Sequence, residues 1–391
     1  MKVICGAVVV GVFCVSALPG PAAGQGLPTQ DTVRRVAGLT PATRLGTITD
    51  ETPEAVTMRV GNATVTIPVE EIQSIEYAGR PTDFLLGGAA ERAGHPEEAA
   101  ERYGRALEAL KAAGESRKYL LQAVKFAIAR VQAKQALGGG QGSGGGDQEA
   151  ESRRQKAEGS TQKGAGADSG AAVEAAIRSL EDFRAGNAQS RHEYPANELL
   201  GQLYMEKGDY ERAQQSLARL EAAAAAEVKA KGTILTARIF RRQKKYGEAE
   251  ARYDKVLGEA ASSETAKLRR QEAMVGKAEC LEDQQKFAEA EKLLRQVVKE
   301  APGEAVEVNA RAYNALGDCL RMAGKPKEAI WEYLHVDLLF PMEREEHAKA
   351  LYYLSELWPK ANHPARADDA RARLVKNYPT SEWAARAGRE K

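Results

Sequence analysis

The sequence predicts a mainly α-helical protein made of repeated helical hairpins, preceded by a small antiparallel β domain. Alanine and long charged residues are abundant while aromatic residues make up only 6%, a composition that favours helices packed through small side chains. Residues 31–79 alternate apolar and polar side chains, and from Phe84 onward the apolar residues recur at helical spacing. The same order of small and large residues then returns several times along the chain.

Residues 1–24 have the features of an export signal. Lys2 precedes an apolar run from Val3 to Leu18, and a "PGP" sequence with small residues follows. This arrangement predicts cleavage near Gly24 and a mature protein in the periplasm or cell envelope. The alternative, a buried N-terminal helix, is disfavoured because the run lacks an amphipathic period and is followed by helix-breaking residues.

Residues 31–79 are predicted to form a small barrel-like β module. Two alternating runs flank Gly61-Asn62, a pair typical of a tight hairpin turn. The pattern resembles the small SH3-like or Sm-like barrels that precede helical repeats in some bacterial exported proteins. An Sm-like barrel would suggest RNA binding, but the net charge of +1 and the lack of an aromatic stacking set disfavour nucleic acid. We therefore expect a folded cap or docking module.

The rest of the chain divides into two helical regions around one interruption. Residues 80–137 form an N-terminal helical segment and residues 171–388 a longer one. Residues 138–170 are rich in glycine and polar side chains, lack an apolar period, and are predicted to be a disordered linker. The helices of 119–137 and 171–183 could be the two halves of one hairpin that this linker interrupts.

The repeated unit is clearest near the C-terminus, where Leu316-Gly317-x2-Leu320 is followed by Ala329-x3-Tyr333. A small residue is needed where two helices cross closely, and a large one fills the space around the crossing. The equivalent alanines are 36, 41, 39 and 38 residues apart: Ala213, Ala249, Ala290, Ala329 and Ala367. The pattern resembles the tetratricopeptide repeat family over residues 80–388 apart from the linker. It implies a superhelix of stacked hairpins.

The resemblance also implies where a partner binds. In this family, partners usually lie against the concave wall formed by the first helix of each hairpin. The residues predicted on that wall are Glu198, Gln202, Met205, Arg238, Arg241, Arg242, Glu279, Glu282, Asp283, Asn314, Asp318 and Arg321. Basic and acidic groups alternate from repeat to repeat, which suits a charged peptide. The alternative is that these are ordinary solvated helix faces carrying local ion pairs.

No arrangement of residues predicts catalysis. The five histidines lack metal-ligand spacing, the glycine-rich stretch lacks the ending of a phosphate loop, and no nucleophile elbow occurs. Cys280 and Cys319 occupy equivalent positions in successive repeats, about 8–10 Å apart by helix packing, which is too far for a disulfide. We expect buried structural thiols, no metal and no cofactor.

The sequence thus predicts a non-enzymatic exported scaffold that binds a protein or peptide on the concave face of the repeats. The alternative is an envelope-anchored structural or assembly subunit of an outer-membrane or cell-wall complex, held by an uncleaved signal or by the β module. A more distant possibility is an accessory to an enzyme complex. Membrane association is expected only through such partners or the uncleaved signal, and the sequence does not predict the oligomeric state.

Overall fold

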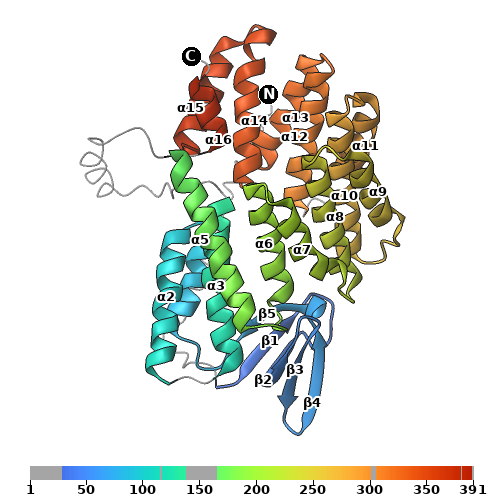
Figure 1. Cartoon of the computed structure of the whole chain (residues 1–391). Coiled ribbons are helices and arrows are strands. Elements are labelled where there is room, and N and C mark those ends of the chain that lie inside the picture. Colours follow the sequence, from blue (N-terminus) through green and yellow to red (C-terminus); the bar gives the residue numbers. More distant parts are fainter. Residues whose placement is uncertain (1–28, 115–116, 138–164, 301–304, 380, 390–391) are drawn as a thin grey trace, which may run out of the picture.

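The computed structural model describes residues 29–114, 117–137, 165–300, 305–379 and 381–389 (Figure 1). The predicted export signal and residues 138–164 of the predicted linker lie outside the described residues. None of the helices in these ranges combines the length and hydrophobicity that a membrane span needs.

The N-terminal domain is a five-stranded antiparallel sheet with the order β4-β3-β2-β1-β5. Its elements are β1 (Asp31–Arg35), β2 (Thr43–Glu51), β3 (Ala55–Val60), β4 (Ala63–Pro68), the 3-10 helix η1 (Val69–Glu71) and β5 (Ile72–Glu76). The predicted hairpin is confirmed, because Val60 pairs with Ala63 across Gly61-Asn62. Gly61 has a φ of 59°, a conformation that glycine adopts without strain.

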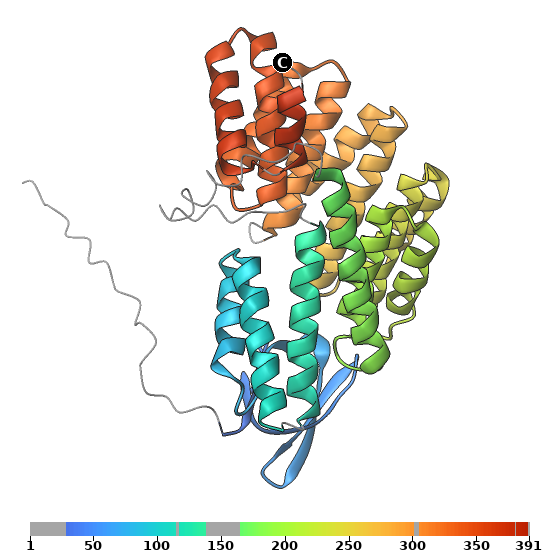
Figure 2. The ribbon, with the colours of Figure 1, turned by 60° about the vertical axis from the view of Figure 1, so that its left-hand side comes forward.

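The sheet does not enclose its own core. Its buried side chains, including Val56 and Met58, cluster with Leu110 of helix α2 (Pro96–Ala112) and with Leu120 and Val124 of α3 (Lys118–Leu137). In Figure 2 the sheet lies across one end of these helices. The β module that the sequence predicts as barrel-like is therefore a five-stranded sheet whose core is completed by two helices.

The remaining helices form consecutive hairpins stacked side by side (Figures 1 and 2). They are α1 (Thr82–Arg92), α5 (Ala165–Gly186), α6 (Glu193–Lys207), α7 (Tyr210–Glu221), α8 (Ala226–Arg242), α9 (Tyr246–Gly258), α10 (Glu264–Asp283), α11 (Phe287–Glu300), α12 (Val306–Met322), α13 (Pro326–Leu339), α14 (Arg344–Leu357), α15 (Pro364–Asn377) and α16 (Glu382–Arg389), with the 3-10 helix η2 (Pro359–Ala361) before α15. The predicted fold class, helical hairpins after a small antiparallel sheet, is confirmed.

Close helix crossings explain why the small residues recur. A Cβ added to Gly87 would lie 2.7 Å from the ring of Tyr103, and one added to Gly317 would lie 2.7 Å from the ring of Tyr333. Both tyrosines are buried. Each glycine is on the first helix of its hairpin and each tyrosine on the second, so the helices approach as closely as the ring allows.

Helices α3 and α5 form one hairpin although residues 138–164 separate them in the chain. They pack against each other, and the rings of Phe126 and Phe183 lie 5.4 Å apart. Helix α5 begins at Ala165, inside the range 138–170 that the sequence suggested was linker. Residues 165–170 continue the α5 helix, because the alanine-rich sequence that follows favours helix formation.

Candidate functional site: a charged wall and a cleft at its end

Helices α6, α8, α10 and α12 line up into one wall, since each contacts the first helix of the next hairpin. The twelve predicted residues lie on these four helices. Many charged members pair between neighbouring helices: Glu198 of α6 lies 2.8 Å from Lys231 of α8, and Arg242 of α8 lies 2.6 Å from Glu206 of α6. The wall therefore carries a ladder of ion pairs from hairpin to hairpin.

The centre of the ladder is Glu279 on α10. Its carboxylate lies 2.5 Å from Arg241 of α8 and 2.6 Å from Arg311 of α12. Burial opposes ionisation of this group, but the two guanidinium groups more than offset it and hold the pKa of Glu279 well below its usual value. Arg241 also lies 2.7 Å from Asp283, so one arginine joins two carboxylates of the next helix.

The α12 end of the wall is equally well connected. Asp318 accepts a hydrogen bond of 2.7 Å from the Tyr333 hydroxyl and lies 2.7 Å from Lys349 of α14 and 3.5 Å from Arg321. The Asn314 amide donates to the backbone carbonyl of Glu346 at 2.8 Å. These groups tie α12 to its neighbours.

Several of the predicted wall residues lack a full set of contacts among the described residues, including Asn314 at its Oδ1 and Arg321 at its Nε. Glu282 is buried, and one of its carboxylate oxygens has no hydrogen-bond partner among the described residues. Burial, with the nearby charges of Glu279 and Asp318, raises its pKa to about 9. The Nε of Arg238 also lacks a partner within the described ranges, and burial lowers the pKa of this guanidinium. Gln202 donates only a long 3.4 Å bond to Glu198.

Met205 completes the predicted set as a largely apolar contact. Its side chain is buried, and its carbonyl accepts from Arg242 at 3.4 Å. The structure thus brings the twelve residues together on one wall, mostly as partners of one another. Whether a partner molecule contacts them stays a prediction.

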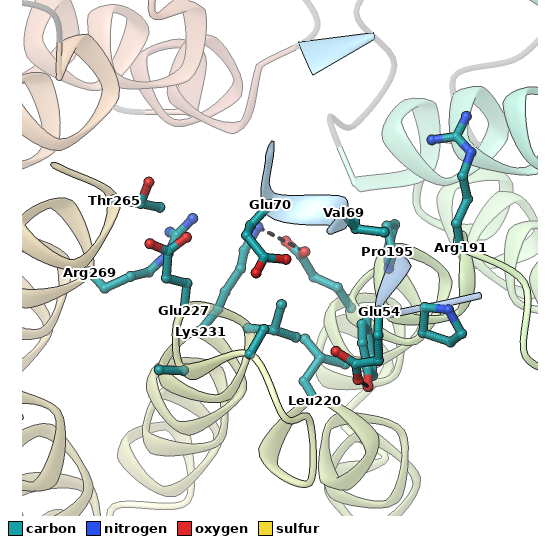
Figure 3. A pocket seen from close by; sticks show the side chains of 16 residues that line it. Glu54, Val69, Glu70, Arg191, Pro195, Leu220, Glu227, Lys231, Thr265 and Arg269 are labelled. Atoms are coloured by element: carbon teal, nitrogen blue, oxygen red, sulfur yellow. Dashed lines mark hydrogen bonds and ion pairs between the residues drawn. The ribbon is translucent and has the colours of Figure 1, made fainter. Parts of the chain in front are cut away.

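A cleft of about 430 Å³ opens where the wall meets the β domain (Figure 3). It is lined from the β domain by Pro53, Glu54, Val69 and Glu70, and from the helices by Arg191, Tyr194, Pro195, Glu198, Leu220, Ala225, Ala226, Glu227, Val228, Lys231, Thr265 and Arg269. Of these, only Glu198 was predicted as a site residue. The others come from five separate stretches of the chain, and no local pattern in the sequence joins them.

A buried ion pair holds the β domain in place beside this cleft. Arg191, just before α6, lies 3.0 Å from Glu51 at the end of β2, and the Tyr77 hydroxyl donates to the same carboxylate at 2.7 Å. The Glu51 side chain is fully buried. Nearby, the Tyr194 hydroxyl donates to Glu54. These contacts fix the position of the cleft wall formed by the β2–β3 connection.

A known protein family matches the part of the chain that forms the stacked helical hairpins. A family model described as tetratricopeptide repeat matches residues 198–265, 234–305 and 282–336. Residues 198–336 are tetratricopeptide repeats. The match extends from α6 to α13 and so contains the whole predicted wall. No curated protein matches the sequence.

Several solved tetratricopeptide repeat and related structures resemble the chain at low identity. A tetratricopeptide repeat protein from Parabacteroides merdae is 16% identical over 76% of this chain and 92% of its own, with a TM-score of 0.44. PilW, a type IV pilus biogenesis factor, is 18% identical over 61% and 97%, with a TM-score of 0.40. A Rap protein complexed with Competence and Sporulation Factor is 16% identical over 77% and 76%, with a TM-score of 0.46.

Proposed function

We propose that this protein is an exported, non-enzymatic scaffold that holds a segment of a protein partner along the wall of α6, α8, α10 and α12. The main support is that the first helices of four successive repeats form one continuous surface that ends at an open cleft. Tetratricopeptide repeats typically serve as protein-interaction modules, and stacking them creates an extended binding surface. The export part of the proposal rests on residues 1–24 alone.

The charged groups of the wall and of the β domain support a structural use of their charges. Among the described residues, no three His, Cys, Asp or Glu side chains gather as metal ligands would. The buried carboxylates Glu51 and Glu279 are held by arginines within hydrogen-bonding distance. Their charges are thereby used to join helices and domains.

Site-specific photo-crosslinking would test the position of the partner. A photoreactive phenylalanine analogue replaces Gln202 on the wall, and in a matched variant it replaces Glu248, which is exposed on α9, the second helix of its repeat. In the native host fraction we expect one adduct from position 202 and none from position 248. Equal adducts from both positions, or none from position 202, would contradict the proposal.

The compartment has its own test. Mass measurement of the protein from its native source should give a mature N-terminus near Gln25 if the signal is cleaved. An intact N-terminus in a membrane fraction would instead favour the anchored assembly subunit. This measurement is independent of the crosslinking result.

A further inference from the structure

We infer that the cleft between the β domain and helices α6, α8 and α10 receives a lysine or arginine side chain from an extended segment of the partner protein. The inference rests on the proposed function and adds the chemistry of the partner. It follows from the shape of the cleft, from its apolar lining, and from which of its charges are already paired.

The cleft suits a long side chain with an aliphatic stem. Pro195 of α6, Leu220 of α7 and Val228 of α8 line it from the helices, and Val69 of η1 lines it from the β domain. Lysine and arginine bury their methylene groups against such apolar surfaces while the charged head stays among polar groups. The volume of about 430 Å³ is within the range of specific ligand sites.

Every cation that lines the cleft already has a carboxylate partner. Arg191 lies 3.0 Å from Glu51, and Lys231 lies 2.8 Å from Glu198. Arg269 lies 2.6 Å from Glu272. An acidic ligand would therefore have to compete with an existing ion pair for each of these groups.

Three carboxylates are left over, Glu54, Glu70 and Glu227. Glu54 accepts from the Tyr194 hydroxyl and Glu227 from the Ser263 hydroxyl at 2.7 Å, both neutral donors. Within the described ranges no lysine, arginine or histidine lies at ion-pair distance from any of the three. Figure 3 shows them on different sides of the cleft, from the β2–β3 connection, η1 and α8. The uncompensated charge of the cleft is therefore negative.

Hydrogen bonding keeps two of these acceptors in position. Burial, together with the bond to Glu54, raises the pKa of Tyr194, so the phenol keeps its proton and remains the donor of this bond at neutral pH. A carboxylate that accepts from a fixed neutral donor keeps lone pairs free for a charged one. Charge-assisted bonds to an ammonium or guanidinium group are stronger than these neutral contacts.

The position of the cleft favours a protein segment as the occupant. Glu198 and Lys231 both line the cleft and belong to the ion-pair ladder of the wall, so the two surfaces are continuous. A chain lying along the wall would reach the cleft with one of its side chains. A free polyamine would satisfy the charges but would gain nothing from the wall.

The test compares two variants that lose the same number of charges. The cleft variant is E54Q/E70Q/E227Q, and the control variant is E248Q/E289Q/E328Q, whose three glutamates are exposed on the second helices α9, α11 and α13. The ligands are fluorescein-labelled twelve-residue peptides of alanine and serine with a lysine at every third position, and the same peptides with glutamate in place of lysine. Binding to the full chain is measured by fluorescence anisotropy.

We expect the lysine peptide to bind more tightly than the glutamate peptide and to lose about tenfold or more in affinity with the cleft variant. The control variant should stay within about twofold of the wild type. The single variant E70Q, at an exposed position, should lose part of the affinity with unchanged circular dichroism and thereby exclude misfolding as the cause.

Three results would overturn the inference. One is equal binding by the cleft and control variants, and another is no preference for the lysine peptide. The third is displacement of the peptide by an equal concentration of spermidine, which would identify a polyamine site. In each case the adduct at position 202 would still support the scaffold, whereas loss of that adduct alone would contradict the proposed function and leave the charge preference of the cleft standing.

Discussion

Replacing Arg191 with methionine should loosen the β domain from the repeats. Arg191 lies 3.0 Å from Glu51, whose side chain is fully buried. Methionine keeps most of the volume but removes the charge, so a buried carboxylate would lose its cation. Breaking such a pair from one side typically costs about 3–5 kcal/mol, a large part of the about 5–15 kcal/mol that stabilises a typical domain.

The cost should depend on pH in a defined direction. Burial raises the pKa of Glu51, although Arg191 and the Tyr77 hydroxyl act to lower it. Removing Arg191 removes a lowering cause, so the pKa in the folded state rises further above that of the unfolded chain. A carboxyl with a raised folded pKa stabilises the protein when protonated, and this contribution is lost as pH rises through the folded value. The variant should therefore lose more stability at pH 8 than at pH 5.

Urea unfolding followed by circular dichroism at both pH values would measure the effect, with hydrogen exchange of β1–β5 locating it. The double variant E51Q/R191M should recover much of the loss, because no charge remains buried. The control is R105M, which removes an exposed ion pair to Glu101 and should cost less than about 1 kcal/mol. A cost for R191M as small as that of R105M at pH 8, or a cost independent of pH, would refute the reasoning.

Three further outcomes follow from buried groups. The substitution Gly317→Ala should destabilise the protein by about 1–3 kcal/mol because the new methyl meets a buried tyrosine ring, whereas Gly247→Ala, with open space around it, should be neutral or slightly stabilising in thermal unfolding. In a variant with the two N-terminal cysteines replaced by serine, Cys280 and Cys319 should resist Ellman's reagent up to pH 9, because burial raises each thiol pKa to about 12. Both should react once urea unfolds the chain. The variant Glu282→Gln should gain stability relative to wild type as pH rises from about 4.5 to about 9, because over this window the carboxyl is ionised in the unfolded chain but still protonated in the folded one; identical pH profiles in urea unfolding would contradict this.

The sequence predicts the repeats well because the packing rule is local. The space at a helix crossing is set by residues about 16 positions apart on one hairpin, such as Gly87 with Tyr103 and Gly317 with Tyr333. The prediction that Cys280 and Cys319 are free and buried is confirmed for the same reason, because equivalent positions in stacked helices have equivalent surroundings.

The packing of the β domain and the lining of the cleft could not be predicted from local sequence patterns. An alternating strand pattern gives the buried face of a sheet but not the surface that covers it, and here Leu120 and Val124 of α3 supply that surface. Arg191 is one charged residue in a short connection, and only the folded chain brings it to Glu51, 140 residues earlier. Contacts at such separation leave no periodicity in the sequence.

The ion pairs along the wall reduce the binding free energy that a partner could gain from each predicted site residue. A partner that approached Arg241 would have to replace bonds to Glu279 and Asp283 that are already formed, so the net gain would be small. Arg242 is more exposed than Arg241 and, among the described residues, has only one carboxylate at ion-pair distance, that of Glu206, where Arg241 has two. Binding energy usually concentrates in a few groups that change partner little when the ligand arrives. The three cleft carboxylates that lack a cation partner within the described part of the chain meet that condition, and the arginines of the wall that are already paired with carboxylates do not. We therefore expect the wall to orient the partner's chain and the cleft at its end to supply the selectivity for charge.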